Sequence, residues 1–174
     1  FWAFTLVLLA LALSGYGMRE ALRVPPVREV RMQVPGLPDA LNGFRIAQLS
    51  DLHIGPTFGK AWLTDVVART DSLNPDLIVI TGDVVDGSPS RLEEDVAPLA
   101  DLKAKYGVIF APGNHEYYSG IQQWLPVFQR LGMHVLMNEN TQIRVNGTPF
   151  AIAGVTDTAA LNWGLEGPDP EKAL

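Results

Sequence analysis

The sequence predicts an α/β fold in a single domain, and three observations support this prediction. Strand-like and helix-like segments alternate through the middle of the chain, as they do in proteins built on a parallel sheet. Two of the strand-like runs, Asp76–Thr81 and Tyr106–Ala111, are continuous and apolar, which is typical of strands covered on both faces. The 174 residues are enough for one domain with a sizeable core.

The N-terminal segment Phe1–Leu13 contains no charged residue. Three interpretations fit it: a transmembrane helix cut off upstream, the core of a signal peptide, or a buried helix. Four arginines follow it and, if the segment spans a membrane, favour a cytoplasmic position for its downstream side (Arg19, Arg23, Arg28 and Arg31). We therefore predict an anchor in the cell membrane over residues 1–17, a linker over 18–26 and the main domain over 27–174, on the cytoplasmic side of the membrane.

Hydrophobic periodicity predicts the elements of that domain. Val27–Val34 alternates apolar and polar residues and predicts an edge strand with one solvated face. The further elements, in order, are a strand from Phe44, a helix over Ala61–Leu73, a strand over Asp76–Thr81, a helix over Pro89–Leu102 that Pro98 is expected to kink, a strand over Tyr106–Ala111, a helix over Ile121–Leu131, a strand over Met133–Met137, and a hairpin over Thr141–Ala153 with Asn146-Gly147 at its turn.

Polar clusters follow three of the predicted strands. Asp51 and His53 follow the first, Asp83 the second, and Asn114 with His115 the third. The spacings from Asp51 to Asp83 and from Asp83 to Asn114 are 32 and 31 residues, about one β-α-β unit each. Ligands bind beyond the carboxyl ends of parallel strands, so the three clusters are expected to meet there. An extended backbone from Asp51 to His53 would point both side chains the same way and turn the residue between them into the core.

These residues carry a family resemblance. Ser50-Asp-Leu-His53, Gly82-Asp83 and Gly113-Asn-His-Glu116 resemble the first three signature blocks of the calcineurin-like metallophosphoesterases, in particular their membrane-associated bacterial branch. The resemblance implies a four-layer αββα sandwich, incomplete at its C-terminus in this chain and preceded by the apolar N-terminal helix. It also implies a phosphoesterase that hydrolyses phosphomono- or diesters with a metal-activated water at a two-metal site.

The resemblance also implies a role for each matching residue. Asp51 and His53 would ligate the first metal, Asp83 would bridge both metals, and Asn114 would ligate the second through its amide oxygen. His115 would donate a proton to the leaving oxygen or steady the developing charge. A mixed oxygen and nitrogen donor set suits two divalent ions such as Mn, Fe, Zn or Ni better than Ca.

Composition limits the alternatives. The chain has no cysteine, which excludes disulfides, thiolate metal sites and cysteine nucleophiles. The net charge of −6 argues against a nucleic-acid surface, so the expected partners are a phosphate ester and a lipid membrane. Asp86 and Asp157 are interpreted as turn or cap residues, and Glu116 either orients a ligand or begins a helix.

The chain departs from the family pattern in its histidines. The family's later blocks, including a Gly-His-Thr-His block, supply further ligands, but the third and last histidine here, His134, lies in a predicted strand. We therefore expect the sequence to be a fragment of a longer protein, with weak metal affinity and little turnover by itself. Two rival hypotheses are a membrane-tethered module that binds a partner without catalysis, and a metal hydrolase acting on amides.

Overall fold

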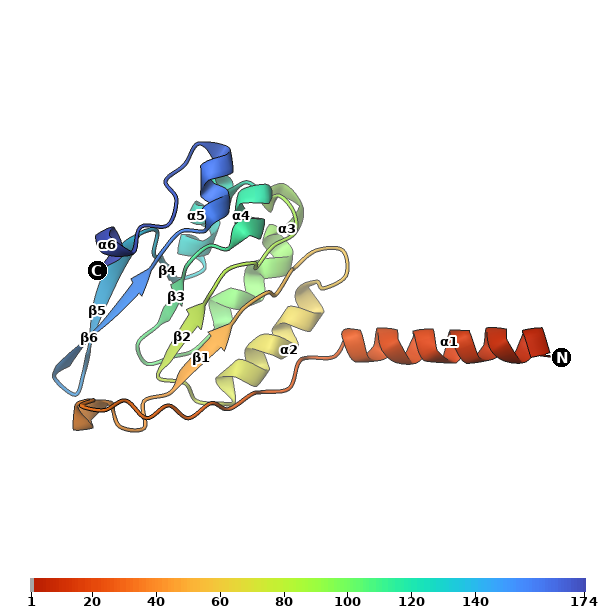
Figure 1. Ribbon diagram of the computed structural model, residues 1–174, viewed down its shortest axis with the longest axis horizontal. Helices are drawn as coiled ribbons and strands as arrows, with labels where there is room; N and C mark the ends of the chain where they lie inside the picture. The colour runs from red at the N-terminus through yellow and green to blue at the C-terminus, as the bar shows by residue number, and fades with distance from the viewer. Residues whose placement is uncertain (1) are drawn as a thin grey trace.

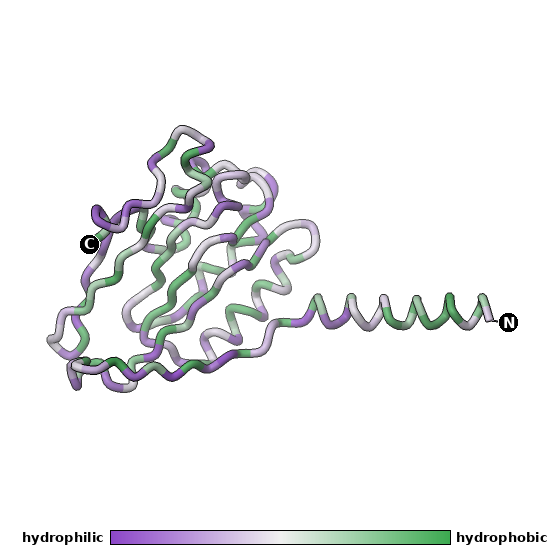
Figure 2. Tube along the Cα trace, viewed as in Figure 1, coloured by the Kyte–Doolittle hydropathy of each residue, from purple (hydrophilic) through white to green (hydrophobic). Residues whose placement is uncertain are grey.

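The N-terminal helix stands clear of the rest of the protein. The computed structural model describes residues 2–174, so the first residue of the predicted anchor, Phe1, lies outside the described residues. Helix α1 (Trp2–Ala21) continues past the predicted end at residue 17, and none of its residues is buried. It projects from the domain and is apolar over most of its length (Figures 1 and 2). By length and composition alone, α1 is long and apolar enough to cross a membrane.

The predicted edge strand at Val27–Val34 is wrong. These residues are exposed and form no strand, and no other strand of the described chain hydrogen-bonds to them. Alternation predicts where a strand is able to form, but the strand itself requires a neighbour whose backbone pairs with it. The segment runs along the domain to the short 3-10 helix η1 (Asp39–Leu41), which precedes the first strand.

The centre of the domain is a four-stranded parallel sheet in the order β1-β2-β3-β4, which Figure 1 shows side by side. Its strands are β1 (Ile46–Leu49), β2 (Leu77–Ile80), β3 (Val108–Phe110) and β4 (Met133–Val135). Each strand lies within the segment predicted to form it, and each is shorter than that segment. Sequential strands are neighbours because a helical connection returns the chain to the same edge each time.

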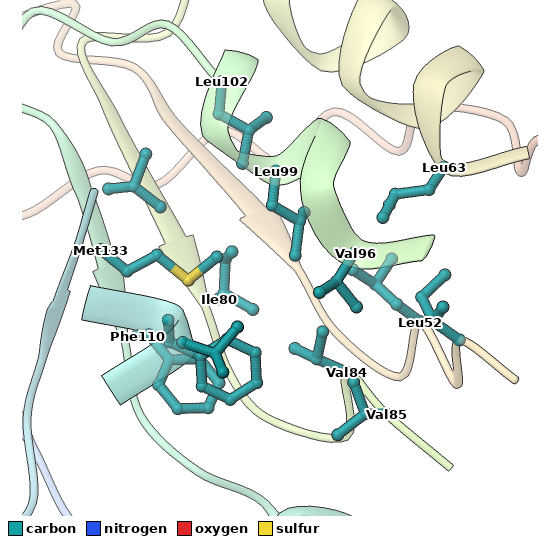
Figure 3. Packing of buried hydrophobic residues seen from close by; sticks show 14 of the residues in the cluster. Leu52, Leu63, Ile80, Val84, Val85, Val96, Leu99, Leu102, Phe110 and Met133 are labelled. Carbon is teal, nitrogen blue, oxygen red and sulfur yellow. The ribbon is translucent and has the colours of Figure 1, made fainter. Parts of the chain in front are cut away.

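Helices cover one face of this sheet and form the main core with it. They are α2 (Lys60–Asp71), α3 (Pro89–Val96) with the 3-10 helix η2 (Ala97–Asp101), and α5 (Ile121–Arg130). The predicted helix over Pro89–Leu102 divides near Pro98, which has no N–H to continue an α-helix. Figure 3 shows Leu63, Val96 and Leu99 from the helices packed toward Ile80 and Phe110 of the sheet.

The C-terminal part adds a second, two-stranded sheet. The strands β5 (Glu139–Val145) and β6 (Thr148–Gly154) pair antiparallel around the predicted Asn146-Gly147 turn. Ile152 of β6 joins a smaller cluster with Leu77 and Ile109 on the sheet face opposite the main core. The 3-10 helix η3 (Thr158–Trp163) and the short α6 (Pro170–Ala173) follow. The structure thus confirms a mixed α/β fold with a parallel sheet and an apolar N-terminal helix.

Candidate metal centre

The three predicted polar clusters meet at one edge of the parallel sheet. Leu49 is paired with Ile80 and Ile80 with Phe110, so β1, β2 and β3 end at the same level. The loops beyond them stay in contact: the backbone N–H of His53 donates to the carbonyl of Asp83 at 3.0 Å. This parallel register explains why residues about 30 positions apart in sequence become neighbours.

Gly82 allows the second and third loops to approach closely. Its φ is +83°, and a Cβ atom at this position would lie 2.1 Å from the backbone nitrogen of Gly113. No side chain larger than hydrogen fits there without moving the backbone. The glycines before Asp83 and Asn114 therefore bring together the loops that carry these two residues.

The backbone at the first cluster is left-handed, not extended as the sequence predicted. Asp51 has φ 57° and His53 has φ 46°, and Asp83 in the second loop has φ 54°. Leu52 between the first two is buried at 5% exposure, as expected. Non-glycine residues adopt this region at a cost of about 1–3 kcal/mol each, and such residues gather at functional sites.

Asp51, His53 and Asp83 form a compact group of metal-ligating side chains. One ligating atom from each lies within 4.8 Å of the other two. The His53 Nε2 is 3.9 Å from the Asp51 Oδ1. One imidazole nitrogen with two carboxylates is a donor set that binds divalent transition metals.

Asn114 faces the same carboxylate. It is the first residue of the short helix α4 (Asn114–Tyr118), whose next residue, His115, donates its backbone N–H to the Asp83 Oδ1 at 2.9 Å. In one orientation the Asn114 amide oxygen points at the Asp83 carboxylate, an arrangement of acceptors that a cation between them would satisfy. With the amide rotated by 180°, its nitrogen would instead donate to the two Asp83 oxygens at 3.3 and 3.2 Å. Only the orientation with the oxygen toward Asp83 offers Asn114 as a ligand to a cation held with Asp83.

Asp86 belongs to the site, although the sequence analysis interpreted it as a turn or cap residue. Its Oδ1 pairs with the Nδ1 of His53 at 3.0 Å and with the Nδ1 of His115 at 2.6 Å. The two imidazole rings lie edge to face with centroids 4.5 Å apart. The Nε2 atom of each ring is therefore left for a metal or a substrate. Asp86 lies three residues after Asp83, but this spacing alone does not distinguish it from an ordinary turn aspartate.

The shared carboxylate changes the protonation of its neighbours. The hydrogen bond to Asp86 raises the pKa of His53 above its ordinary value, and this outweighs burial, which lowers it. Burial is the largest single effect on the pKa of Asp86 and raises it, but hydrogen bonds from His53 and His115 together bring that pKa below its ordinary value. Asp86 is therefore an anion that holds both imidazoles.

Glu116 holds the second and third loops together from beneath. Its side chain is fully buried and accepts three backbone N–H groups, from Asp83 at 2.9 Å, Val84 at 2.7 Å and Gly113 at 2.8 Å. Burial raises the pKa of this carboxyl group, although the three donors act in the opposite direction. Of the two roles that the sequence left open, the contacts support the positioning role, and Glu116 also lies within α4.

The remaining histidine and Asp157 are not among the candidate metal ligands. His134 is an exposed residue of β4 paired with Ile109, as predicted for a strand residue. Asp157 caps η3 by accepting the backbone N–H of Ala159 at 2.7 Å. Neither belongs to the two groups of candidate ligands found among the described residues.

Comparison with known proteins gives a consistent result. The sequence model of the calcineurin-like phosphoesterases matches residues 44–164, which include every residue of the site. A zebrafish (Danio rerio) protein named "Transmembrane protein with metallophosphoesterase domain" is 37% identical over 97% of this chain and 40% of its own length. An uncharacterized metallophosphoesterase of Campylobacter jejuni is 32% identical over 95% of this chain and 42% of its own length. An uncharacterized metallophosphoesterase of Helicobacter pylori is 33% identical over 94% of this chain and 43% of its own length. The chain thus spans about two fifths of the length of these relatives, and no solved structure matches it significantly.

Proposed function

This chain belongs to the calcineurin-like phosphoesterase family, and from that premise we propose that it hydrolyses phosphomono- or diesters with a metal-activated water. One observation carries the proposal: three strand-end loops bring two carboxylates, an imidazole and an amide to one edge of the sheet. The whole protein's activity and substrate are part of the proposal, because the chain covers only part of its relatives.

Two divalent cations, of Mn, Fe, Zn or Ni, would be held by four residues. Asp51 and His53 are the proposed ligands of one, Asn114 of the other, and Asp83 of both. When bound, such a pair stabilises the attacking and leaving oxygens of an in-line displacement and lowers the pKa of a bound water. The amide of Asn114 supplies an oxygen without a further negative charge, which limits repulsion of an anionic phosphate.

His115 is the proposed proton donor to the leaving oxygen. Its Nδ1 is engaged by Asp86, so its Nε2 is the atom available to the substrate. Asp86 fixes the orientation of the ring through this contact. Because the same Asp86 oxygen also holds His53, the proton donor and a metal ligand share one positioning residue.

Attachment to the membrane is also part of the proposal. Helix α1 supports it by its length and apolar composition, and none of its residues is buried. Arginines at and after its end favour a cytoplasmic position for the phosphoesterase domain, which we place at residues 27–174. The name of the zebrafish relative, a transmembrane protein, agrees with this arrangement.

The test is hydrolysis of chromogenic phosphomono- and diesters by the full-length protein with Mn²⁺. We expect Asp83→Asn to lower turnover by more than about 100-fold, since loss of outer-shell partners alone costs 10–100-fold. The matched control is Asp65→Asn, which removes an exposed carboxylate from α2, outside the site. Equal rates in the Asp83 variant and the unaltered protein would refute the mechanism, and metal binding without any hydrolysis would favour the non-catalytic binding module.

A further inference from the structure

A cavity opens directly beside the proposed metal ligand Asn114. Its volume is about 360 Å³. It lies between α4 and the C-terminal 3-10 helix η3, and its lining residues are Asn114, Tyr118, Asp157, Thr158, Ala159 and Asn162. A group attached to a phosphate at the metal centre has room to extend into it, because the cavity and the centre share Asn114.

The two walls of the cavity are fixed against each other. Tyr117 and Ile121 on one side pack with Ala159 and Ala160 on the other in a buried cluster. Asp157 adds a cap hydrogen bond that starts η3. Because η3 is packed against its neighbours, the polar side chains that it presents to the cavity are held in place.

The lining is polar and carries no positive charge. It offers the Asp157 carboxylate, the Asn162 amide and the Thr158 hydroxyl as hydrogen-bonding groups. Tyr118 adds an aromatic ring that is 57% exposed and lies 5.6 Å, centroid to centroid, from the His115 ring. A carboxylate without a neighbouring Lys or Arg in the lining repels a second anionic group, whereas hydroxyl groups donate to it readily.

We propose that this cavity binds the alcohol portion of the substrate and that this portion is neutral and hydroxylated, such as a polyol or a sugar. The proposal rests on the phosphoesterase function argued above and names its substrate class. Asp157 and Asn162 hydrogen-bond the hydroxyl groups, and the Tyr118 ring packs against the C–H face between them. The alcohol is then placed next to His115, which protonates its departing oxygen.

The test compares two esters that differ in hydroxyl groups only. Glycerol 1-phosphate and propyl phosphate have the same number of carbons, and each is offered to the full-length protein as a monoester and as its methyl diester. The measured quantity is the ratio of kcat/KM for the glycerol ester to that for the propyl ester. We expect the ratio to exceed about 10 in the unaltered protein, since two hydrogen bonds of about 1 kcal/mol each correspond to about 30-fold.

Asn162→Ala removes a hydrogen-bonding group and should lower this ratio about threefold to tenfold. Tyr118→Ala removes the ring that packs on the C–H groups of both esters, so it should lower kcat/KM for the glycerol and propyl esters together. Comparing ratios between variants cancels the difference in intrinsic reactivity of the two esters. Gln129→Ala, which removes an exposed amide from α5 outside the cavity, is the matched control and should leave the ratio unchanged.

The outcomes separate this proposal from the function on which it depends. Hydrolysis of chromogenic esters with equal rates on the glycerol and propyl esters would overturn the hydroxyl-binding cavity and leave the phosphoesterase function standing. An unchanged ratio in Asn162→Ala would overturn it as well. Absence of hydrolysis of every ester by the unaltered protein would overturn both.

Discussion

Replacing Glu116 by glutamine would remove one acceptor oxygen from the side chain that joins two loops of the metal centre. Glu116 is fully buried, and its two oxygens accept the backbone N–H groups of Asp83, Val84 and Gly113. Glutamine has the same shape but only one acceptor oxygen, and its amide nitrogen is a donor. The substitution therefore changes hydrogen bonding with little change in packing.

The contacts allow the cost to be estimated. The single oxygen of glutamine keeps two bonds if it takes the position that now accepts from Asp83 and Gly113. The new NH₂ group then faces the N–H of Val84, so one charge-assisted bond is lost and two buried donors, the Val84 N–H and the NH₂ itself, are left facing each other without an acceptor. Each of these costs about 1–3 kcal/mol, and removal of a buried charge offsets part of the sum. We expect a net loss of about 2–3 kcal/mol in the free energy of unfolding, or about 4–12 °C in Tm.

Thermal unfolding of the purified full-length protein measures the loss of stability, and Mn²⁺ titration measures the loss of metal affinity. The Mn²⁺ affinity of Glu116→Gln should fall together with Tm, because Asp83 and Asn114 lie on the loops that Glu116 joins. Glu94→Gln changes an exposed glutamate of α3 and should alter stability by less than about 0.5 kcal/mol. A Glu116 variant as stable as this control would refute the argument that the three N–H contacts hold the loops.

Three further predictions concern metal binding, proton donation and backbone approach. Because the hydrogen bond to Asp86 raises the pKa of His53 above 6.5, its imidazolium form persists to higher pH and competes with the metal. Mn²⁺ affinity measured by calorimetry should therefore rise as the pH increases above 6.5, and Asp86→Asn should move this rise to lower pH. An affinity that does not change with pH would contradict this prediction. His115→Gln should lower turnover by about 10²–10⁴-fold while Mn²⁺ affinity stays within a few-fold, and an equal loss of both would instead make His115 a ligand. Gly82→Ala should lower the free energy of unfolding, measured by chemical denaturation, by well over the roughly 1 kcal/mol expected for Gly107→Ala. Both glycines have φ near +84°, but only a Cβ at Gly82 meets another backbone segment. Equal losses in the two variants would show that the close approach of Gly82 to Gly113 is unimportant.

Most of the fold was predictable because its strands and helices carry clear local patterns. The runs at Asp76–Thr81 and Tyr106–Ala111 contain β2 and β3, and Asn146-Gly147 marks the hairpin turn. Val27–Val34 has an equally clear pattern and forms no strand. Alternation describes the two faces of a segment, but it contains no information about whether another strand lies beside it.

The convergence of the site was predictable from spacing, but its internal contacts were not. Strand ends about 30 residues apart indicated that Asp51, Asp83 and Asn114 meet, and a parallel register brings them together. The extended backbone expected around Asp51 was wrong, because the loop is left-handed there. Asp86 was missed because an aspartate in a turn is common, and only the tertiary structure shows that two histidines contact it.

The left-handed backbone of the loops and the clustering of carboxylates both lower the stability of the fold, and burial of the adjacent core residues offsets this cost. Residues adjacent to the candidate ligands are buried: Ile54 next to His53, and Val84 next to Asp83, are both 0% exposed. These two loops are therefore anchored in the core at one residue while the adjacent residue presents a ligand, so the ligand geometry depends on core packing as well as on the hydrogen bonds to Glu116. Since carboxylates held within 4.8 Å of an imidazole and of one another repel as anions, cation binding relieves a cost already present in the fold. A cation that binds the folded chain and not the unfolded one must then raise its stability, by about 2.7 kcal/mol at a concentration of 100 times Kd.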